Sequence, residues 1–416
     1  MEENILDLKS FELENGLQII SIKKNTRLFS LHFGVKIGSI YEDDKEKGIS
    51  HFIEHMLFKG TSNMNNEQLN EAFEELGGEY NAYTDYNCTV YSVTALNEEF
   101  NRSLYLLSDM IKNAVFDKEE FNKEKEVILS EIRSVKDDIE DYSFNKIHEI
   151  GFLNGPLKYD TIGSEKNINK FTRQDIIQFY KKYYAPNNCS IVVVSNIEHE
   201  EVILNVKKYF DNWNKKSIIK RSVLAEKNLP LKKISYKNDI EQSTIIYMFT
   251  FHNLTRIEEM ALKILNYKLG ESANSILFRE IREKKGLAYD IYSELNTSKN
   301  IKTMYIYTAV RKSNIDDAAR CIDRCLEKVK NKKNFIDDKS IAVMKKVLKT
   351  AVVSTIEDTT DLSNYALHQC LDGESIYEFL EDIKNVDSVN CNDIMVVANK
   401  VLNDPTIHIL TSKESD

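Results

Sequence analysis

The chain has 416 residues, 42% of them hydrophobic, so its length suggests two to four domains with a large core. Its formal net charge of −10 argues against binding to nucleic acid or to an anionic membrane, because both need concentrated Lys and Arg. The first residues, Met1–Asp7, carry acidic side chains where a secretory signal carries basic ones, and no apolar run has the length of a membrane span. We therefore expect a cytoplasmic globular protein.

The six cysteines are scattered without a C-x-x-C pair. This pattern indicates neither a disulfide framework nor a zinc ribbon, and we expect reduced, mostly buried thiols. Cys321 and Cys325 share a helix face by their spacing, but no histidine nearby completes a metal site there.

The first half of the sequence predicts a sheet covered by helices. Apolar and β-branched runs alternate with stretches of helical periodicity, and Gly77 and Gly78 mark the end of one helix. In chain order the predicted elements are strands at 17–23 and 30–37, helices at 52–57 and 65–76, strands at 79–84 and 89–95, and helices at 97–113 and 117–138.

The second half repeats this order of elements. It predicts strand structure at 235–251, helices at 257–269 and 275–284, a strand pair within 286–310 and a helix at 315–329. The run Gly286–Tyr292 parallels Gly78–Tyr83, and each is followed by a strand and a long helix. We therefore expect an α+β fold of two homologous halves, each a sheet packed by helices, with domains at 1–215 and 230–416. The basic, irregular run 214–231 is the expected linker.

The pentad His51-Phe52-Ile53-Glu54-His55 is the strongest functional signal. Residues three or four apart lie on one face of a helix, so both imidazoles and the carboxylate of Glu54 can converge on one point. This H-x-x-E-H order is typical of a zinc site, although a capped helix with two partly buried imidazoles is the structural alternative. The second half has no counterpart, so only the first half is expected to hold a metal.

Two histidines leave a catalytic zinc short of a third protein ligand. The helix predicted at 117–138 is rich in glutamate, and Glu124 and Glu131 lie two helical turns apart near apolar Ile128. Spacing alone does not choose between the acidic residues of this helix.

The chain resembles the pitrilysin/insulinase family of zinc peptidases in its short two-domain form. Besides the pentad, the resemblance rests on the runs at 77–84, 155–156, 184–188 and 279–289, so it covers nearly the whole chain. In that family a glutamate about 76 residues after the pentad completes the ligand set, and Glu131 lies 76 residues after His55. The resemblance therefore implies Glu131 as the third ligand and Glu124 as a second carboxylate that orients a ligand histidine.

The activity implied by the resemblance is that of a zinc metalloendopeptidase, which hydrolyses peptides or unfolded segments in an enclosed chamber. One Zn²⁺ per chain would be held by His51, His55 and Glu131. Glu54 would be the general base that deprotonates the attacking water.

The resemblance also implies substrate contacts outside the pentad. Arg282 and Tyr289 match an Arg and a Tyr, seven residues apart, that stabilise the oxyanion and bind the substrate in the family. We also expect an extended substrate to add a strand at the edge near Asn81 and Ala82, with a simple turn role as the alternative for Asn81. The two halves would form half of a clamshell, with Arg282 and Tyr289 completing the site in trans in a homodimer, or in a heterodimer with a related chain.

Two functional alternatives remain, of which the first keeps the protease activity and the second belongs to another class. One is a dedicated protease that matures a single precursor peptide, and the other is a catalytically silent family subunit that acts as a partner or scaffold. The intact ligands and base argue against the silent subunit. The sequence does not separate general peptide clearance from maturation of one precursor.

Structural alternatives also exist for single residues. Arg282 could be a surface partner of Glu280 or Glu283, and Tyr289 a core aromatic. Glu124 could lie on a solvated helix face. The remaining histidines have no ligand-like companions by spacing; they are His32, His148, His199, His252, His368 and His408.

Overall fold

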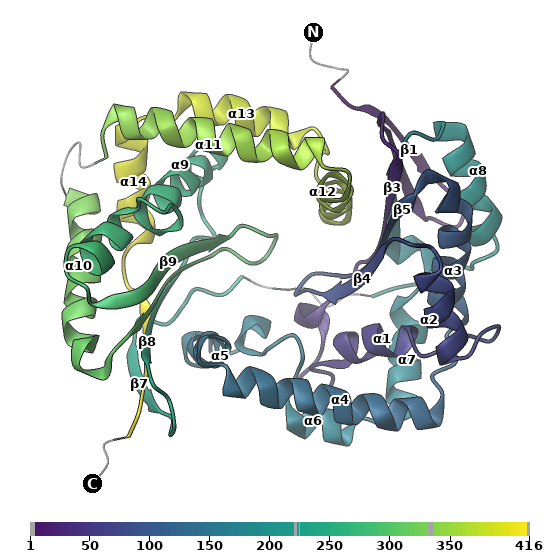
Figure 1. The fold of residues 1–416 in the computed structure, drawn as a ribbon, viewed down its shortest axis with the longest axis horizontal. Helices are drawn as coiled ribbons and strands as arrows, with labels where there is room; N and C mark the ends of the chain where they lie inside the picture. The colour runs from purple at the N-terminus through teal and green to yellow at the C-terminus, as the bar shows by residue number, and fades with distance from the viewer. Residues whose placement is uncertain (1–4, 220–222, 224, 332–335, 414–416) are drawn as a thin grey trace. The chain divides into compact units, whose positions relative to one another are not determined.

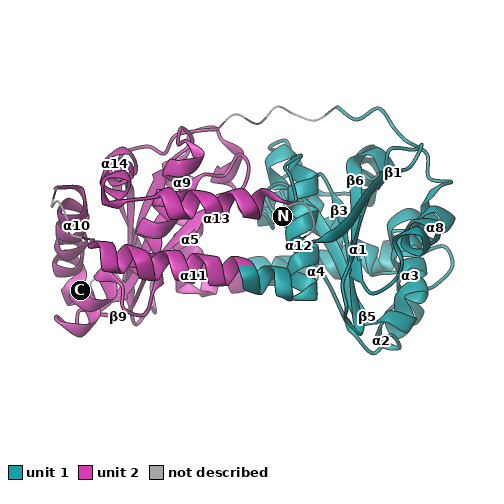
Figure 2. Cartoon of the chain, turned by 90° about the horizontal axis from the view of Figure 1, so that it is seen from above, with its two compact units in different colours: residues 1–133, 160–222, 353–376 teal, residues 134–159, 223–352, 377–416 magenta. Residues whose placement is uncertain are grey.

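The computed structural model describes residues 5–219, 223, 225–331 and 336–413. The chain divides into two compact units (Figure 2). Unit 1 comprises residues 1–133, 160–222 and 353–376, and unit 2 comprises residues 134–159, 223–352 and 377–416. The predicted domain ranges, 1–215 and 230–416, follow chain order, whereas the compact units exchange residues 134–159 and 353–376 between them. The predicted acidic start, Met1–Asp7, and the predicted linker lie partly outside the described residues.

Unit 1 is built on a six-stranded mixed sheet (Figure 1). The strands, in spatial order, are β1 (Asp7–Glu12), β2 (Gln18–Lys23), β6 (Cys189–Ser195), β3 (Leu28–Val35), β5 (Thr89–Leu96) and β4 (Glu79–Thr84). Strands β2 and β6 are parallel and the other neighbours are antiparallel. Strand β1 was not predicted, because its residues are mostly exposed and have no apolar alternation. Strand β4 forms an edge of the sheet.

The helices of unit 1 include the four that the first half of the sequence predicts, at 52–57, 65–76, 97–113 and 117–138. The helix predicted at 65–76 begins with a reciprocal capping box between Asn65 and Gln68 and ends before Gly77, which has a φ of 63°. The helices are α1 (Ile49–Leu57), α2 (Asn66–Glu74), α3 (Phe100–Asn113), α4 (Lys118–Asp137), α6 (Glu165–Lys170), α7 (Arg173–Tyr183), α8 (His199–Phe210) and α12 (Thr359–Asp372). The last residues of α4 belong to unit 2.

Unit 2 has a five-stranded sheet with the same order of equivalent strands as unit 1. In spatial order the strands are β7 (Lys232–Tyr236), β11 (Thr406–Thr411), β8 (Ser243–Thr250), β10 (Thr303–Val310) and β9 (Ala288–Asn296). Strands β7 and β11 are parallel, as β2 and β6 are, and the remaining pairs are antiparallel. The predicted α+β fold with two homologous halves is confirmed, with β1 as an additional edge strand in unit 1.

The helices around the second sheet are α5 (Ile139–Gly151), α9 (Arg256–Asn266), α10 (Ile315–Asn331), α11 (Asp338–Glu357), α13 (Glu378–Ser388) and α14 (Cys391–Val401). The stretches Tyr267–Glu271 and Phe278–Glu283 form wider, π-type turns. Within the described ranges, no helix combines the length and apolar character that crossing a bilayer requires.

One helix of each unit comes from the other half of the chain. Helix α12 packs on β3 and β6 of unit 1, and α5 packs on the equivalent strands β8 and β11 of unit 2. The approach of α12 is close, because a Cβ added at Gly34 would lie 2.7 Å from Cδ1 of Leu371. A buried hydrogen bond of 2.9 Å joins His32 Nδ1 to Ser363 Oγ. The predicted elements include neither helix, and contacts between segments so distant in sequence have no local signal.

The N-terminus of α1 is capped by a side chain from outside the helix. The fully buried Glu42 carboxylate accepts hydrogen bonds from the backbone N–H groups of Gly48 and Ser50, at 2.9 and 2.8 Å. Burial raises the pKa of Glu42 to about 7, although the two amides and the nearby Lys47 ammonium favour the charged form. The helix that carries the pentad is therefore anchored at its first turn.

This buried acid predicts a pH-dependent stability. Between about pH 4.5 and 7 the unfolded chain releases a proton that folded Glu42 retains, so the free energy of unfolding decreases as pH rises through this window. The loss reaches about 3 kcal/mol above pH 7, and Glu42→Gln should not show it. Urea unfolding at pH 5 and 8 measures the difference. Glu67→Gln, an exposed substitution on α2, should follow the wild type; parallel curves for Glu42→Gln and wild type would contradict the assignment.

Candidate metal centre

Helix α1 separates its apolar and polar residues onto two faces. The fully buried residues of its apolar face are Phe52, Ile53, Met56 and Leu57. His51, Glu54 and His55 are half-buried on the other face, and the two imidazole centroids lie 4.6 Å apart. The apolar spacing thus turns the pentad's polar groups toward one common region.

Helix α4 brings Glu131 to the two histidines. Its Oε2 lies 3.6 Å from Nε2 of His55 and 3.9 Å from Nε2 of His51. One candidate ligand atom from each of the three residues can be chosen so that all lie within 4.8 Å of one another. Spacing in the sequence did not distinguish among the glutamates of α4. In the folded chain, Glu131 is the one whose carboxylate completes the group with the two histidines.

The donor set fits a zinc ion. Nitrogen and oxygen ligands about 2.0–2.2 Å from zinc at tetrahedral angles stand about 3.3–3.6 Å apart, close to the observed separations. Two imidazoles and one carboxylate leave a fourth position for water, as catalytic zinc sites do. The carboxylates of Glu54, Glu124 and Glu131 surround the imidazoles, so the local field favours a cation.

Glu124 orients one of the imidazoles. Its Oε2 lies 3.0 Å from Nδ1 of His55, which directs the lone pair of Nε2 toward Glu131. Burial disfavours the charged imidazole, but the bond to Glu124 and the charge of Glu131 outweigh it and raise the pKa of His55. Glu124 is 5% exposed, so its alternative placement on a solvated helix face is wrong.

Within the described part of the chain, the imidazole of His51, unlike that of His55, has no carboxylate that orients it. Burial, together with the charge of His55, lowers the pKa of His51 to about 3, so its ring is neutral at physiological pH, as metal binding requires. Nδ1 of His51 is buried and has no hydrogen-bond partner among the described residues. The orientation of this ring therefore depends on packing rather than on a carboxylate.

Two residues at the centre were not predicted from the sequence. The Lys59 ammonium lies 2.8 Å from Oε1 of Glu124, so both oxygens of that buried carboxylate are paired. The Thr84 hydroxyl donates to Oε2 of Glu54 at 2.7 Å. Lys59 lies one helical turn after His55, which is a usable signal, whereas the contact of Thr84 with α1 has no local signal.

Arg282 and Tyr289 meet in unit 2. Arg282 lies in the turn Phe278–Glu283, and Tyr289 lies near the start of β9. The guanidinium carbon of Arg282 lies 5.3 Å from the centre of the Tyr289 ring and 4.9 Å from that of Phe278. Tyr289 is 74% exposed, so the alternative of a core aromatic is wrong. Glu280 pairs with Lys284.

The predicted substrate-binding residues lie on the edge strand. Asn81 is exposed on β4, and Ala82 follows it. The Ala82 N–H donates to the Asn81 side-chain oxygen at 2.9 Å. An incoming strand that uses this amide would replace a bond within the chain.

The other histidines and the cysteines show no second metal centre in the described ranges. The group of His51, His55 and Glu131 is the one set of three or more His, Cys, Asp or Glu residues found there with metal-binding geometry. Each of the other six histidines forms a hydrogen bond with another protein group. The pairs are His32 with Ser363, His148 with Tyr305, His199 with Ser21, His252 with the Glu226 carbonyl, His368 with Tyr83, and His408 with Ser235. All six cysteines are free thiols, as predicted.

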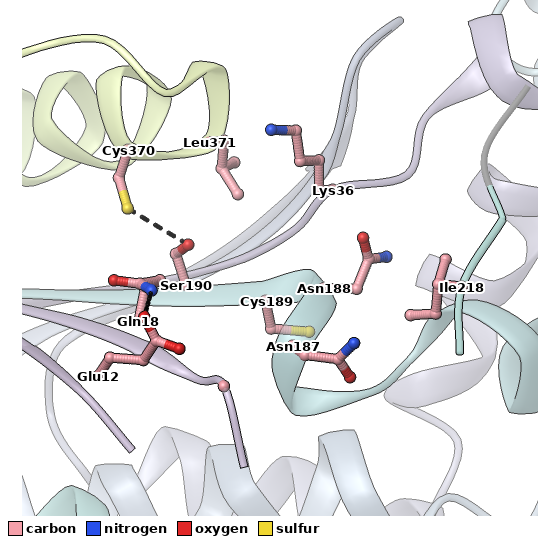
Figure 3. A pocket seen from close by; sticks show the side chains of 11 residues that line it. Glu12, Gln18, Lys36, Asn187, Asn188, Cys189, Ser190, Ile218, Cys370 and Leu371 are labelled. Atoms are coloured by element: carbon pink, nitrogen blue, oxygen red, sulfur yellow. Dashed lines mark hydrogen bonds between the residues drawn. The ribbon is translucent and has the colours of Figure 1, made fainter. Parts of the chain in front are cut away.

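A pocket of about 550 Å³ opens elsewhere in unit 1 (Figure 3). It lies where β2 and β6 begin, beside the C-terminal end of α12, and the Cys370 thiol donates to Ser190 across it. Its other polar lining residues include Lys36, Asn187 and Asn188. None of the predicted site residues line this pocket.

Comparisons with known proteins agree with this geometry. The family described as Insulinase (Peptidase family M16) matches residues 18–165, and the Peptidase M16 inactive domain matches residues 170–348. A relative from Rickettsia felis, named an uncharacterized zinc protease, is 30% identical over 409 residues, covering 95% of each chain. A protein from Arabidopsis thaliana, named a probable mitochondrial-processing peptidase subunit beta, is 25% identical over 411 residues, covering 95% of this chain and 76% of its own.

Solved structures share the fold. A protease from Helicobacter pylori has a TM-score of 0.91 at 22% identity, covering 98% of this chain and all of its own. A structure from Pseudomonas fluorescens, described as a peptidase M16 inactive domain, has a TM-score of 0.88 at 16% identity, covering 99% of each chain.

The contact between Glu124 and His55 predicts a change in metal affinity. Glu124→Gln keeps the shape of the side chain but removes its charge, and we expect zinc affinity to fall by about 10–100-fold. Competition with a chromophoric chelator measures this. Glu126→Gln on the exposed face of α4 is the matched control and should leave the affinity unchanged. Equal affinities for Glu124→Gln and wild type would refute the supporting role.

Proposed function

The chain belongs to the insulinase family and is a zinc-dependent metallopeptidase, and from this premise we propose that it is an endopeptidase acting on peptides and unfolded segments. The observation that carries the proposal is the convergence of His51, His55 and Glu131 beside the Glu54 carboxylate. These three residues would hold one Zn²⁺ per chain.

Glu54 would move the proton during hydrolysis. When bound, zinc supplies Lewis acidity that makes water nucleophilic near neutral pH. The Glu54 carboxylate accepts a proton as the water oxygen bonds to the peptide carbonyl carbon, and it returns that proton to the leaving nitrogen as the C–N bond breaks. Burial raises the pKa of Glu54, although the Thr84 hydroxyl and the charge of His55 oppose this shift. A raised pKa suits a group that must both accept and donate a proton.

The substrate would bind as an additional strand on β4. This strand is at the edge of its sheet, and Asn81 and Ala82 lie in its middle. Main-chain hydrogen bonds to an edge strand give affinity with weak sequence preference. Extended peptides and unfolded segments can offer such a strand, whereas folded proteins cannot.

Arg282 and Tyr289 would complete the site from a partner chain. The exposed Tyr289 hydroxyl can donate to the oxyanion, and the guanidinium can bind substrate carbonyl groups. We propose a homodimer, or a heterodimer with a related chain, that encloses a chamber in the cytoplasm. The family resemblance and the pairing of these two side chains support this proposal.

The alternatives differ in their support. A silent subunit would have no need of the three ligand groups or of Glu54, and the proximity of these groups favours an enzyme. Maturation of one precursor peptide requires the same zinc chemistry. The name of the relative from Arabidopsis thaliana refers to such processing in that protein.

The role of Glu54 predicts a separation of metal binding from turnover. Glu54→Gln should retain zinc while hydrolysis of a quenched peptide library falls by about 10²–10⁴-fold. Metal analysis and initial rates on the same preparation measure both quantities. Glu71→Gln, exposed on α2, is the control and should keep both activity and zinc. A chelator should abolish wild-type activity, and added zinc should restore it; a preparation that zinc does not activate would favour the silent subunit.

Completion in trans predicts complementation between inactive chains. Mixing Glu54→Gln chains with Tyr289→Phe chains should recover activity above either variant alone, because one site of each mixed dimer has both intact residues. Mixing Glu54→Gln with the double variant regenerates no intact site and serves as the control. Heterodimers are verified with two affinity tags, and heterodimers without recovered activity would exclude a shared site.

A further inference from the structure

We propose that Thr84 is a positioning residue for peptide hydrolysis, whose hydroxyl holds the Glu54 carboxylate in the orientation that proton transfer requires. This inference rests on the proposed role of Glu54. The Thr84 hydroxyl donates to Oε2 of Glu54 at 2.7 Å, and both side chains are half-buried. The contact joins two segments 30 residues apart.

The strand places this hydroxyl beside α1. Side chains alternate along β4, and Tyr80 and Ala82 pack against the core of unit 1. Thr84 has the same phase, so it also faces α1, which contacts β4. The pairing of Thr84 with Thr89 on β5 fixes the position of its backbone. Thr84 thus projects from an ordered strand rather than from a loop.

Hydrogen bonds to α12 fix the opposite face of β4. The Tyr83 hydroxyl donates to the side-chain oxygen of Asn364 at 2.7 Å and lies 2.8 Å from Nε2 of His368. Both partners are on α12, the helix that reaches unit 1 from the second half of the chain. Adjacent residues therefore tie the end of β4 to helices on both faces. This bracing resists rotation of the strand about its axis and keeps the Thr84 hydroxyl aimed at Glu54.

The hydrogen bond from Thr84 gives the two carboxylate oxygens of Glu54 different roles. Oε2 accepts from Thr84, which leaves Oε1 to exchange protons with water and the leaving amine. A bond to an ionised carboxylate is stronger than one between neutral groups and limits rotation of the Glu54 side chain. Proton transfer depends steeply on orientation, so a freely rotating base reacts more slowly even when the substrate binds normally.

Thr89 provides a matched control for loss of a threonine hydroxyl. It pairs directly with Thr84 across the two strands, so both side chains lie on the same face of the sheet. Its hydroxyl donates to the Ile37 carbonyl at 3.0 Å, not to Glu54. Thr89→Val therefore removes one hydroxyl from the same part of the sheet without removing the contact with the base.

The kinetic test compares Thr84→Val, Thr84→Ser and Thr89→Val with the wild type on one quenched peptide. We expect Thr84→Val to lower kcat by about 10–100-fold while KM and zinc content stay unchanged. Thr84→Ser restores the hydroxyl and should recover most of kcat. Thr89→Val should keep kcat even though its melting temperature falls. Thr84→Ala should show the same kinetic loss and replaces Thr84→Val if that variant does not fold.

A second measurement needs no activity. The shift in melting temperature caused by Thr84→Val is measured in the metal-free wild type and in a Glu54→Ala background. If the hydroxyl contacts the carboxylate, the shift is larger when Glu54 is present. The same comparison with Thr89→Val should give equal shifts in the two backgrounds.

The outcomes separate this inference from the proposed function. A wild type without zinc-dependent hydrolysis overturns the proposed function and this role with it, whatever the melting temperatures show. An active wild type matched in kcat by Thr84→Val, or a Thr89→Val variant with an equal loss of kcat, overturns the positioning role alone. A serine variant as slow as the valine variant does the same.

Discussion

The stacking of Phe52 on Phe121 is the contact on which the metal centre depends. Their ring centroids lie 5.1 Å apart at an angle of 20°, and the rings join α1 to α4 within the core of unit 1. Aromatic pairs of this kind add about 0.5–1.5 kcal/mol to the burial of their surface. Because His51 adjoins Phe52 on α1, and Glu124 lies one turn after Phe121 on α4, this packing fixes which groups of the two helices face each other. A shift of either helix by one turn would separate the histidines from Glu131.

Burial of Glu124 is tolerated because α1 and the turn that follows it supply partners for both carboxylate oxygens. His55 on α1 and Lys59, just beyond the end of that helix, lie four residues apart and reach Oε2 and Oε1, respectively. A buried carboxylate is costly unless it is paired, and here the pairing also orients a candidate ligand. The segment from His51 to Lys59 therefore carries two of the three candidate ligands, the candidate base and the cation that neutralises Glu124. Its first turn is anchored separately, by the Glu42 carboxylate.

The predicted metal ligands and substrate contacts are distributed over both halves of the duplicated topology. Strands β4 and β9 occupy equivalent edges of their sheets, and each carries predicted substrate contacts: Asn81 and Ala82 on the first, Tyr289 on the second. Only the first half has the pentad, in keeping with the description of the matching second domain as inactive. The exchanged helices α5 and α12 cover equivalent strands, so each sheet is completed by the other half of the chain. Through Tyr83, this arrangement places α12 directly behind the edge strand of the candidate site.

Local patterns in the sequence were sufficient for most of the strands, for the helix that bears His51, Glu54 and His55, and for the repetition of the two halves, but not for β11, which lies inside the second sheet. These features depend on side-chain periodicity, capping and glycine conformation, which act over a few neighbouring residues. The choice of Glu131 came from family resemblance, because several glutamates of α4 have similar spacing. Packing alone revealed the contacts of Thr84, Lys59 and Glu42 and the exchange of α5 and α12. The reason is physical: a contact between residues far apart in the chain forms only after burial of apolar surface has set the helices and strands against one another.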